Sequence, residues 1–438
     1  MNNSSLLDSA VHKSMVRLVP LMLLLYILAF LDRANIGVAK VQYMADTGIG
    51  SAAFASGASI FFLAYAFLGA PCNLLMKKVG AKRWIAFTTI LWGLVSCSLA
   101  IADTETKFVT TRFLLGATEA GFFPGMIYLT SLWFPQKNRG TIIGMFYVGP
   151  CIALALGTPF SGALLEGLHG WLGHPGWFWM FLVEGLLAAA VGVFVYFYLD
   201  SEPKHARFLN DGERKALMRE LSQEEQKSVA SRISDAIKIP RVWALAIAYG
   251  VIQLSVYGLA FYLPSTVAKL ISSVNVTFIS TLVAAIPWVV AGFATYYIPR
   301  YAAKRFAEAH YAALVLTIAG IGVIGSAVLS ASPVASIFCL SLAASGFIAV
   351  QPMFWTMPSA ILSGSALAAG IGFVNMFGAF GGALGAPVRE FAEPIFGNPM
   401  APQIVMGVTA IFGAILIYSL RPQQAGSQQP IAEEVIAK

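Results

Sequence analysis

Two opposite charges stand side by side near the end of a long apolar segment, in the stretch ILAFLDRANIG at 27–37. Asp32 can carry a proton, and Arg33 can bind an anion, because a planar guanidinium holds a carboxylate through two hydrogen bonds and stays charged. A charge at the centre of a membrane helix costs roughly 2.5 to 3.5 kcal/mol, and such residues usually line a cavity and pair with one another. Adjacent positions on a helix do not face each other. We therefore expect at least one of the two to have a partner on another helix.

A second stretch, TRFLLGATEAGFFPGM at 111–126, supplies candidate partners. Arg112 and Glu119 are seven residues apart, about two helical turns, so both project from one face. Gly116 and Gly121 allow another helix to approach this segment closely. Pro124 predicts a kink.

Together the two stretches provide two acids and two bases, which can neutralise one another when no substrate is bound. A substrate anion that takes an arginine away from its carboxylate would raise the proton affinity of that acid. By linkage, proton binding would then favour anion binding. The pattern predicts a site that couples an anion to a proton. The alternative interpretation is that the four charges only hold helices together.

Other polar residues stand in apolar surroundings. Glu184, in GWFWMFLVEGLL, fits either a packing hydrogen bond or a proton relay. In the second half of the chain the candidates for a binding site are neutral: Gln253, Tyr257, Trp288, Gln351, Trp355, Thr356 and Asn375, to which Tyr65 and Tyr147 add from the first half. Amides and hydroxyls in an aromatic cleft suit a hydroxylated substrate, although each residue could also serve packing alone.

We predict that membrane helices carry these residues. Of 438 residues, 58% are hydrophobic and 11% are charged, against about a quarter charged in soluble domains. Apolar runs of roughly 20 residues recur, the length that crosses about 30 Å of hydrocarbon as a helix. They lack the alternation of barrel strands. The twelve predicted segments are 18–42, 54–76, 84–102, 107–132, 141–165, 177–199, 241–268, 276–298, 311–330, 333–357, 365–388 and 402–420.

The basic residues predict the orientation of these segments. With the N-terminus in the cytoplasm, 22 of the 28 basic residues fall in cytoplasmic segments, and four fall outside: Lys40, Lys107, Lys269 and Arg389. The positive-inside rule then places both termini in the cytoplasm. The net charge of +7 follows from this topology, so we expect no nucleic-acid partner. The four cysteines fall in four different segments without ligand spacing, and we expect no metal and no cofactor.

The longest polar stretch, 200–240, divides the segments six and six. We predict an N-terminal six-helix bundle at 1–199, a cytoplasmic linker with short amphipathic helices at 200–240, a C-terminal bundle at 241–422 and a tail at 423–438. A shift of 228 residues aligns Gly144, Gly157 and Pro159 with Gly372, Gly385 and Pro387. The fold class is therefore an all-α membrane protein with twelve transmembrane helices in two pseudo-symmetric six-helix bundles.

The same shift reveals an asymmetry between the halves. The charged positions Asp32, Arg33, Arg112, Glu119 and Glu184 align with Ala260, Phe261, Leu340, Phe347 and Phe412. Since a general folding requirement would be expected in both halves, the charges indicate a task assigned to the first half.

The chain resembles a known family at several motifs: FLDRANIGVA, APCNLLMKKVGAKRW, RFLLGATEAGFFPGMIYLTSLWFP, GWFWMFLVEG and GIGFVNMFGAFGG. These are similar to the anion:cation symporters of the major facilitator superfamily, a group with sugar-acid, tartrate and phthalate permeases. Over nearly its full length the chain resembles bacterial inner-membrane transporters of L-rhamnonate. The resemblance implies a major facilitator fold in the bacterial inner membrane.

The resemblance also implies site roles. Asp32 and Glu119 would carry protons, Arg33 would bind the substrate carboxylate, and Arg112 would tune Glu119. Tyr65, Trp355 and Asn375 match positions that line the sugar-acid site.

The function we predict is proton-coupled import of a small hydroxylated organic anion, with L-rhamnonate as the best candidate. The expected partners are that anion, protons and the lipid bilayer, and the expected state is a monomer. The alternatives are a proton-driven exporter of amphipathic compounds, a symporter of another carboxylate such as tartrate or phthalate, and a membrane sensor. An enzyme is not expected, since the sequence contains no phosphate-binding loop, nucleophile motif or metal cluster.

Overall fold

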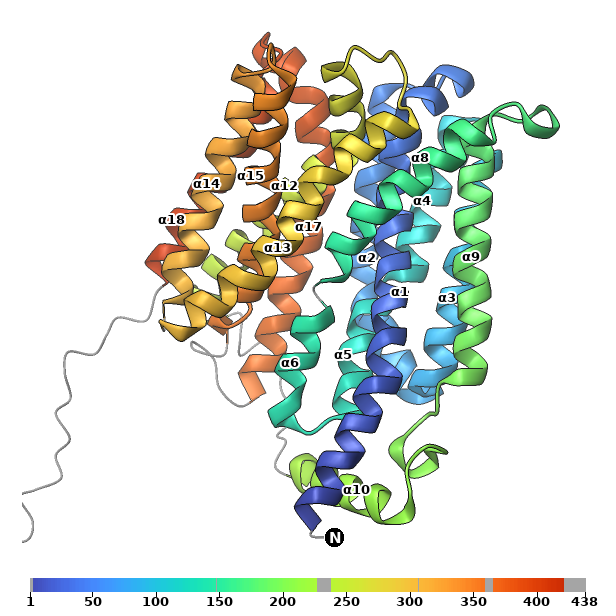
Figure 1. Cartoon of the computed structure of the whole chain (residues 1–438), viewed down its shortest axis with the longest axis vertical. Coiled ribbons are helices and arrows are strands. Elements are labelled where there is room, and N and C mark those ends of the chain that lie inside the picture. The colour runs from blue at the N-terminus through green and yellow to red at the C-terminus, as the bar shows by residue number, and fades with distance from the viewer. Residues whose placement is uncertain (1–2, 147, 227–237, 306, 359–364, 421–438) are drawn as a thin grey trace, which may run out of the picture.

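The computed structural model describes residues 3–146, 148–226, 238–305, 307–358 and 365–420, and within them every regular element is helical (Figure 1). The first half contains α1 (Asn3–Thr47), α2 (Ser51–Val79), α3 (Ala81–Ser98), α4 (Glu105–Glu119), α5 (Phe122–Trp133), α6 (Gln136–Phe146), α7 (Gly149–Ile152), α8 (Thr158–Gly167) and α9 (Gly176–Tyr198). The second half contains α12 (Pro240–Leu270), α13 (Phe278–Lys304), α14 (Glu308–Val328), α15 (Pro333–Phe354), α17 (Ser365–Phe396) and α18 (Ala401–Ser419). Between them lies α10 (Asp211–Gln226).

The predicted membrane segments coincide with these helices. Eleven helical stretches in the described part of the chain are long and apolar enough to cross a membrane. The remaining predicted segment, 107–132, is present as α4 and α5, which are separated at Ala120 and Gly121. Pro124 explains this break, because its nitrogen has no hydrogen to donate and its ring crowds the carbonyl of the residue four positions earlier, Ala120. The predicted kink is confirmed.

The fifth predicted segment, 141–165, is also discontinuous. Between α7 and α8 the backbone forms a π-helical turn at Ala153–Gly157. Pro159, in the first turn of α8, again removes a backbone donor, and π-helical turns commonly arise where the regular hydrogen-bond ladder is interrupted.

Glycines allow the helices that carry the charges to approach their neighbours. A side chain on Gly116 of α4 would lie 2.1 Å from the backbone oxygen of Phe61 in α2. A side chain on Gly37 of α1 would lie 2.5 Å from the backbone oxygen of Phe261 in α12. Only a glycine permits backbones this close, so Gly37 lets the two halves meet beside the predicted charged pair.

The halves lie side by side and contact each other in a symmetric way (Figure 1). The second predicted segment, α2, packs against the eleventh, α17, and the fifth, α8, packs against the eighth, α13. Two related six-helix bundles predict such reciprocal contacts between equivalent helices. The contacts confirm the fold class. The helix α10 lies at the lower end of the view, beside the start of α1. The predicted tail at 423–438 lies outside the described residues.

Several polar contacts join the halves at the end opposite α10. Lys40 of α1 forms an ion pair with Glu390 of α17, with 2.8 Å between Nζ and Oε2. The amide nitrogen of Gln42 donates to the backbone oxygen of Val276, and the backbone N–H of Phe278 donates to Glu166. This end of the interface is closed in the structure.

Candidate substrate and proton site

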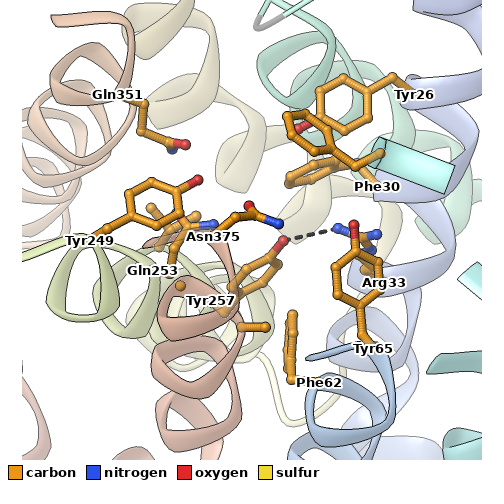
Figure 2. A pocket seen from close by; sticks show the side chains of 14 residues that line it. Tyr26, Phe30, Arg33, Phe62, Tyr65, Tyr249, Gln253, Tyr257, Gln351 and Asn375 are labelled. Carbon is orange, nitrogen blue, oxygen red and sulfur yellow. Dashed lines mark hydrogen bonds between the residues drawn. The ribbon is translucent and has the colours of Figure 1, made fainter. Parts of the chain in front are cut away.

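Arg33 is the central residue of the predicted site. Its Nε donates to Oε2 of Glu119 on α4 at 2.7 Å, and both side chains are buried. Its Nη1 donates to the hydroxyl of Tyr257 on α12 at 3.1 Å (Figure 2). The expected partner on another helix is confirmed. Arg33 therefore connects an acid of its own half to a hydroxyl of the opposite half.

Asp32, the next residue along α1, lies in a different environment. It is 1% exposed, and the hydroxyl of Ser96 on α3 donates to its Oδ1 at 2.8 Å. Its Oδ2 has no hydrogen-bond partner among the described residues. No basic side chain in the described part of the chain has a nitrogen within 4 Å of the Asp32 carboxylate. Ser96 could not be predicted as a partner from the sequence, because a single serine in an apolar helix carries no distinguishing pattern.

Arg112 is fully buried but does not reach Glu119. Its Nε donates to the backbone oxygen of Gly57 at 3.4 Å, and its guanidinium carbon lies 4.6 Å from the ring centre of Phe61. Among the described residues its two terminal nitrogens have no hydrogen-bond partner. The expectation that two acids and two bases neutralise one another is therefore only half right, because direct contact joins one pair, Arg33 and Glu119.

Glu184 belongs to a separate buried cluster of neutral donors. Asn35 of α1 donates to its Oε2 at 3.0 Å, and the hydroxyl of Ser161 on α8 donates to its Oε1 at 2.6 Å. All three residues are at most 1% exposed. The cluster ties α1, α8 and α9 together, which provides the packing hydrogen bonds of the first interpretation of Glu184.

A narrow cavity lies between the halves at the level of Arg33. Five predicted substrate residues line it: Arg33, Tyr65, Gln253, Tyr257 and Asn375. Gln351, also a candidate, lines it too. Figure 2 shows Arg33 and Tyr65 on one side of the cavity, and Tyr249, Gln253, Gln351 and Asn375 on the other. The solvent-accessible volume is about 40 Å³, room for a few waters at most. A larger ligand therefore requires the surrounding side chains or helices to move.

One of the predicted substrate residues does not take the expected place. Trp355 follows the end of α15 and does not line the cavity, because the ring of Tyr249 packs against it at 4.8 Å between centroids and takes the cavity-facing position. Tyr147 lies outside the described residues.

The cavity wall also contains aromatic residues that the sequence analysis missed. They are Tyr26, Phe30, Phe62, Phe123 and Tyr249. A signal was present: Tyr26, Phe30 and Arg33 follow helical spacing on α1, and Tyr249, Gln253 and Tyr257 follow it on α12. Around Arg33, the ring centres of Tyr65 and Phe30 lie 5.0 and 5.4 Å from the guanidinium carbon, within the range of cation–π attraction.

A bundle of two related halves that crosses the membrane, with a charged and polar cavity at their interface, is the architecture of a membrane transporter. The chain belongs to the Major Facilitator Superfamily, whose family model matches residues 22–386. It is a multi-pass membrane transporter.

Two relatives and one solved structure agree with this assignment. The chain is 55% identical to the inner membrane transport protein RhmT of Escherichia coli K12, over 98% of this chain and 99% of that protein. It is 35% identical, over 98% and 99%, to a protein of Agrobacterium vitis whose name assigns it provisionally to tartrate transport. The crystal structure of a bacterial homologue of the human lysosomal transporter Spinster, inward-facing and occupied, shares the fold with a TM-score of 0.71 at 17% identity, over 92% of this chain and 96% of that one.

Proposed function

We propose that this protein is a proton-coupled symporter that imports a small hydroxylated organic anion, a sugar acid of the L-rhamnonate type, across the bacterial inner membrane. The observation that supports this most is the position of Arg33. It is a buried cation at the cavity between the halves, bound at once to an acid, Glu119, and to a hydroxyl of the opposite half, Tyr257. An incoming carboxylate can replace either partner.

The coupling follows from that exchange. When the substrate carboxylate binds Arg33, Glu119 loses its charged hydrogen-bond donor and becomes a costly buried anion, since it is 0% exposed. Protonation of Glu119 removes that cost. Proton and anion therefore favour each other's binding, and by linkage the effect is reciprocal. Arg112, without a direct ion pair, contributes positive charge near Glu119 and tunes it.

Asp32 is the second proton-carrying acid in this proposal. It lies next to Arg33 in the chain and has one hydrogen bond from Ser96 and a free carboxylate oxygen. Glu184, held by Asn35 and Ser161, is the candidate for a proton relay on the same helix bundle.

The second half supplies recognition of the substrate's hydroxyls. The amides of Gln253, Gln351 and Asn375 and the hydroxyl of Tyr257 line the wall opposite Arg33. The side-chain oxygen of Gln253 is buried without a hydrogen-bond partner among the described residues. Neutral donors and acceptors in an aromatic wall fit a sugar acid better than an apolar acid, because each hydroxyl that enters must find a hydrogen bond.

The charge distribution and the interface give the cycle a direction. With both termini in the cytoplasm, the end of the interface closed by the Lys40–Glu390 pair is the outer one, so import requires this end to open and admit the substrate. We propose a monomer as the functional unit, since each chain contains both halves of the cavity.

The test is uptake of radiolabelled L-rhamnonate into proteoliposomes under an imposed inward proton gradient, with and without a protonophore. Accumulation that the protonophore abolishes, and that L-rhamnonate but not neutral L-rhamnose competes for, supports the proposal. Accumulation of tartrate or phthalate instead would keep the symporter and replace the substrate. Proton-driven movement of amphipathic compounds out of the cytoplasm, with no uptake of any carboxylate, would replace the proposal by the exporter.

A further inference from the structure

A second cavity lies at the closed end of the interface, away from the central site. Its solvent-accessible volume is about 790 Å³, and its walls come from α1, α12, α17 and the ends of α14, α15 and α18. Three of the four basic residues that the charge distribution places outside line it: Lys40, Lys269 and Arg389. On the basis of the proposed function, we propose that this outer cavity is a second binding site, which holds the hydroxylated carboxylate before the central site opens to it.

The charges of the outer cavity leave cations available for an anion. Lys40 is paired with Glu390, whose Oε2 also accepts from the hydroxyl of Tyr262 at 3.1 Å. Arg389 donates to a neutral group, the hydroxyl of Thr266, at 3.2 Å. Neither Arg389 nor Lys269 has an ion pair within 4 Å in the described part of the chain.

In the described part of the chain, the one other acid that lines the cavity is Glu393. Beyond the Lys40–Glu390 pair, two cations therefore face one carboxylate. A wall with an excess of one charge sign concentrates ligands of the opposite sign near it.

The uncharged part of the wall suits a polyol. Hydroxyl groups line it at Ser265, Thr266, Ser326 and Ser336, and Gln403 adds an amide. The Ser265, Ser326 and Ser336 hydroxyls donate to backbone oxygens, so each keeps lone pairs that accept a hydrogen bond. Cations together with several hydroxyl acceptors fit a hydroxylated carboxylate better than a purely inorganic anion.

Lys40 connects this site to the closure of the interface. It is 13% exposed, lies 4.1 Å from the ring centre of Tyr262, and forms the ion pair that joins α1 to α17. A carboxylate in the outer cavity competes with Glu390 for Lys40. Its binding weakens a contact that holds the halves together at this end, so arrival of the substrate favours opening toward it.

Chemical labelling tests the site without relying on transport. In right-side-out vesicles, a membrane-impermeant amine reagent modifies exposed lysines, and mass spectrometry follows Lys269 with Lys107 as the internal control. Lys107 is 58% exposed and pairs with Asp103 elsewhere on the surface. We expect L-rhamnonate to slow modification of Lys269 and not of Lys107, and L-rhamnose and inorganic phosphate to have no effect. Equal protection by phosphate would assign the site to anions in general and overturn the hydroxylated-carboxylate class.

The same labelling in Arg33→Gln separates the outer site from the central one. Protection that persists in this variant supports a distinct outer site. Protection that disappears with Arg33 would come from the central site, and it would overturn the proposal, as would the absence of protection in both proteins.

Transport provides the second readout. At low ionic strength, we expect KM to be about two- to fivefold higher in Lys269→Gln than in the parent, with kcat unchanged, as for a partly exposed charge contact. We expect Lys107→Gln to change neither value. Equal KM values for the two variants would overturn the outer site while the symporter remains. If the parent transports no carboxylate, the proposed function falls, and protection of Lys269 by carboxylates still decides whether the outer site exists.

Discussion

The two halves of this protein share a helix plan and differ in what they bury at equivalent positions. Where the first half has Arg33, Arg112 and Glu119, the second has Phe261, Leu340 and Phe347, each at most 3% exposed. The apolar residues pack tightly, so helices at these positions form a stable bundle without any charge. The charges are therefore not needed for packing at these positions, which supports the proposal that they serve transport. In our proposal, the half that carries the charges exchanges protons, and the other half selects the ligand through neutral groups.

The largest effect is expected where the charged half binds the substrate. Arg33→Gln removes the only cation bound to Glu119 among the described residues and leaves that acid unpaired in the interior. It also removes the cation that would bind the substrate carboxylate, and loss of one partner of a buried charge pair in a binding site costs about 2 to 5 kcal/mol, so we expect affinity for the carboxylate to fall by about 30-fold or more. Isothermal titration of the purified protein with L-rhamnonate measures this.

The matched control is Phe261→Leu, at the position of the second half that aligns with Arg33. It alters packing against Gly37 and Phe62 without touching a charge. Loss of binding in both variants to the same extent would mean that Arg33 matters for packing at the interface alone, and the division between the halves would be lost.

The next effect separates substrate movement from proton coupling. In Glu119→Gln the side chain keeps its shape and can still accept from Arg33, but it cannot exchange a proton. We expect exchange of labelled for unlabelled L-rhamnonate to continue and accumulation driven by a proton gradient to stop. Counterflow and gradient-driven uptake in proteoliposomes measure the two activities separately.

Glu184→Gln is the comparison for that variant. Glu184 is also buried, but its partners, Asn35 and Ser161, are neutral. Normal accumulation in Glu184→Gln limits this residue to packing, whereas lost accumulation with retained exchange assigns it to the proton relay. An accumulating Glu119→Gln transporter would remove Glu119 from the coupling mechanism.

The sequence predicted most of the fold because membrane helices are specified by length and composition, which a single chain displays directly. It also predicted Pro124 as a helix break, since the missing backbone donor is a local property. Contacts between distant segments were less accessible. Seven-residue spacing placed Arg112 and Glu119 on one helix face, but the sequence could not show that Arg112 turns toward Gly57 and Phe61 instead.

The neutral wall shows the same limit. Gln253, Tyr257 and Asn375 were predicted from their polarity in apolar helices. Trp355 was predicted to line the wall both as a polar side chain in an apolar segment and through the family resemblance, but Tyr249 takes that place and packs against Trp355. Which of two neighbouring aromatic residues faces a cavity depends on tertiary packing, not on residue type.

A smaller effect is expected in the neutral half. Asn375→Ala and Gln253→Ala each remove one amide from the cavity wall. One neutral hydrogen bond contributes about 0.5 to 1.5 kcal/mol, so we expect KM for L-rhamnonate to rise about 2- to 12-fold with proton coupling intact. Uptake kinetics with L-rhamnonate and with a carboxylate of similar size that lacks hydroxyls measure the selectivity. If both substrates weaken equally, or if accumulation is lost, the neutral half does more than recognise hydroxyls.

The smallest effect concerns the connection between the halves. Glu213 of α10 is 3% exposed and holds the start of α1, where Ser9 and Lys13 donate to it at 2.7 and 2.9 Å. It also accepts from the backbone N–H of Asn210, whose side chain caps the helix in return. Burial raises the pKa of Glu213, but the hydrogen bonds from Lys13, Ser9 and Asn210 outweigh this and hold its pKa below the ordinary value of 4.5.

The stability that Glu213 provides depends on pH. Because the pKa is lower in the folded state, the contact stabilises the fold above the ordinary pKa, and this stabilisation is lost as the pH falls below about 4.5 toward the lowered value. Glu213→Gln keeps a side chain that can complete the cap but removes the charge, so we expect it to flatten this part of the stability profile. Glu213→Ala also loses the cap and should cost about 1 kcal/mol at neutral pH. Hydrogen exchange of α10 against pH measures both.

Transport by the two Glu213 variants tests whether α10 does more than join the halves. If α10 only joins them, L-rhamnonate uptake at neutral pH stays at the parent level even where α10 exchanges faster. If uptake falls in proportion to the loss of α10 protection, the linker helix fixes how α1 moves, and the asymmetry of the halves extends beyond the buried charges to the element that connects them.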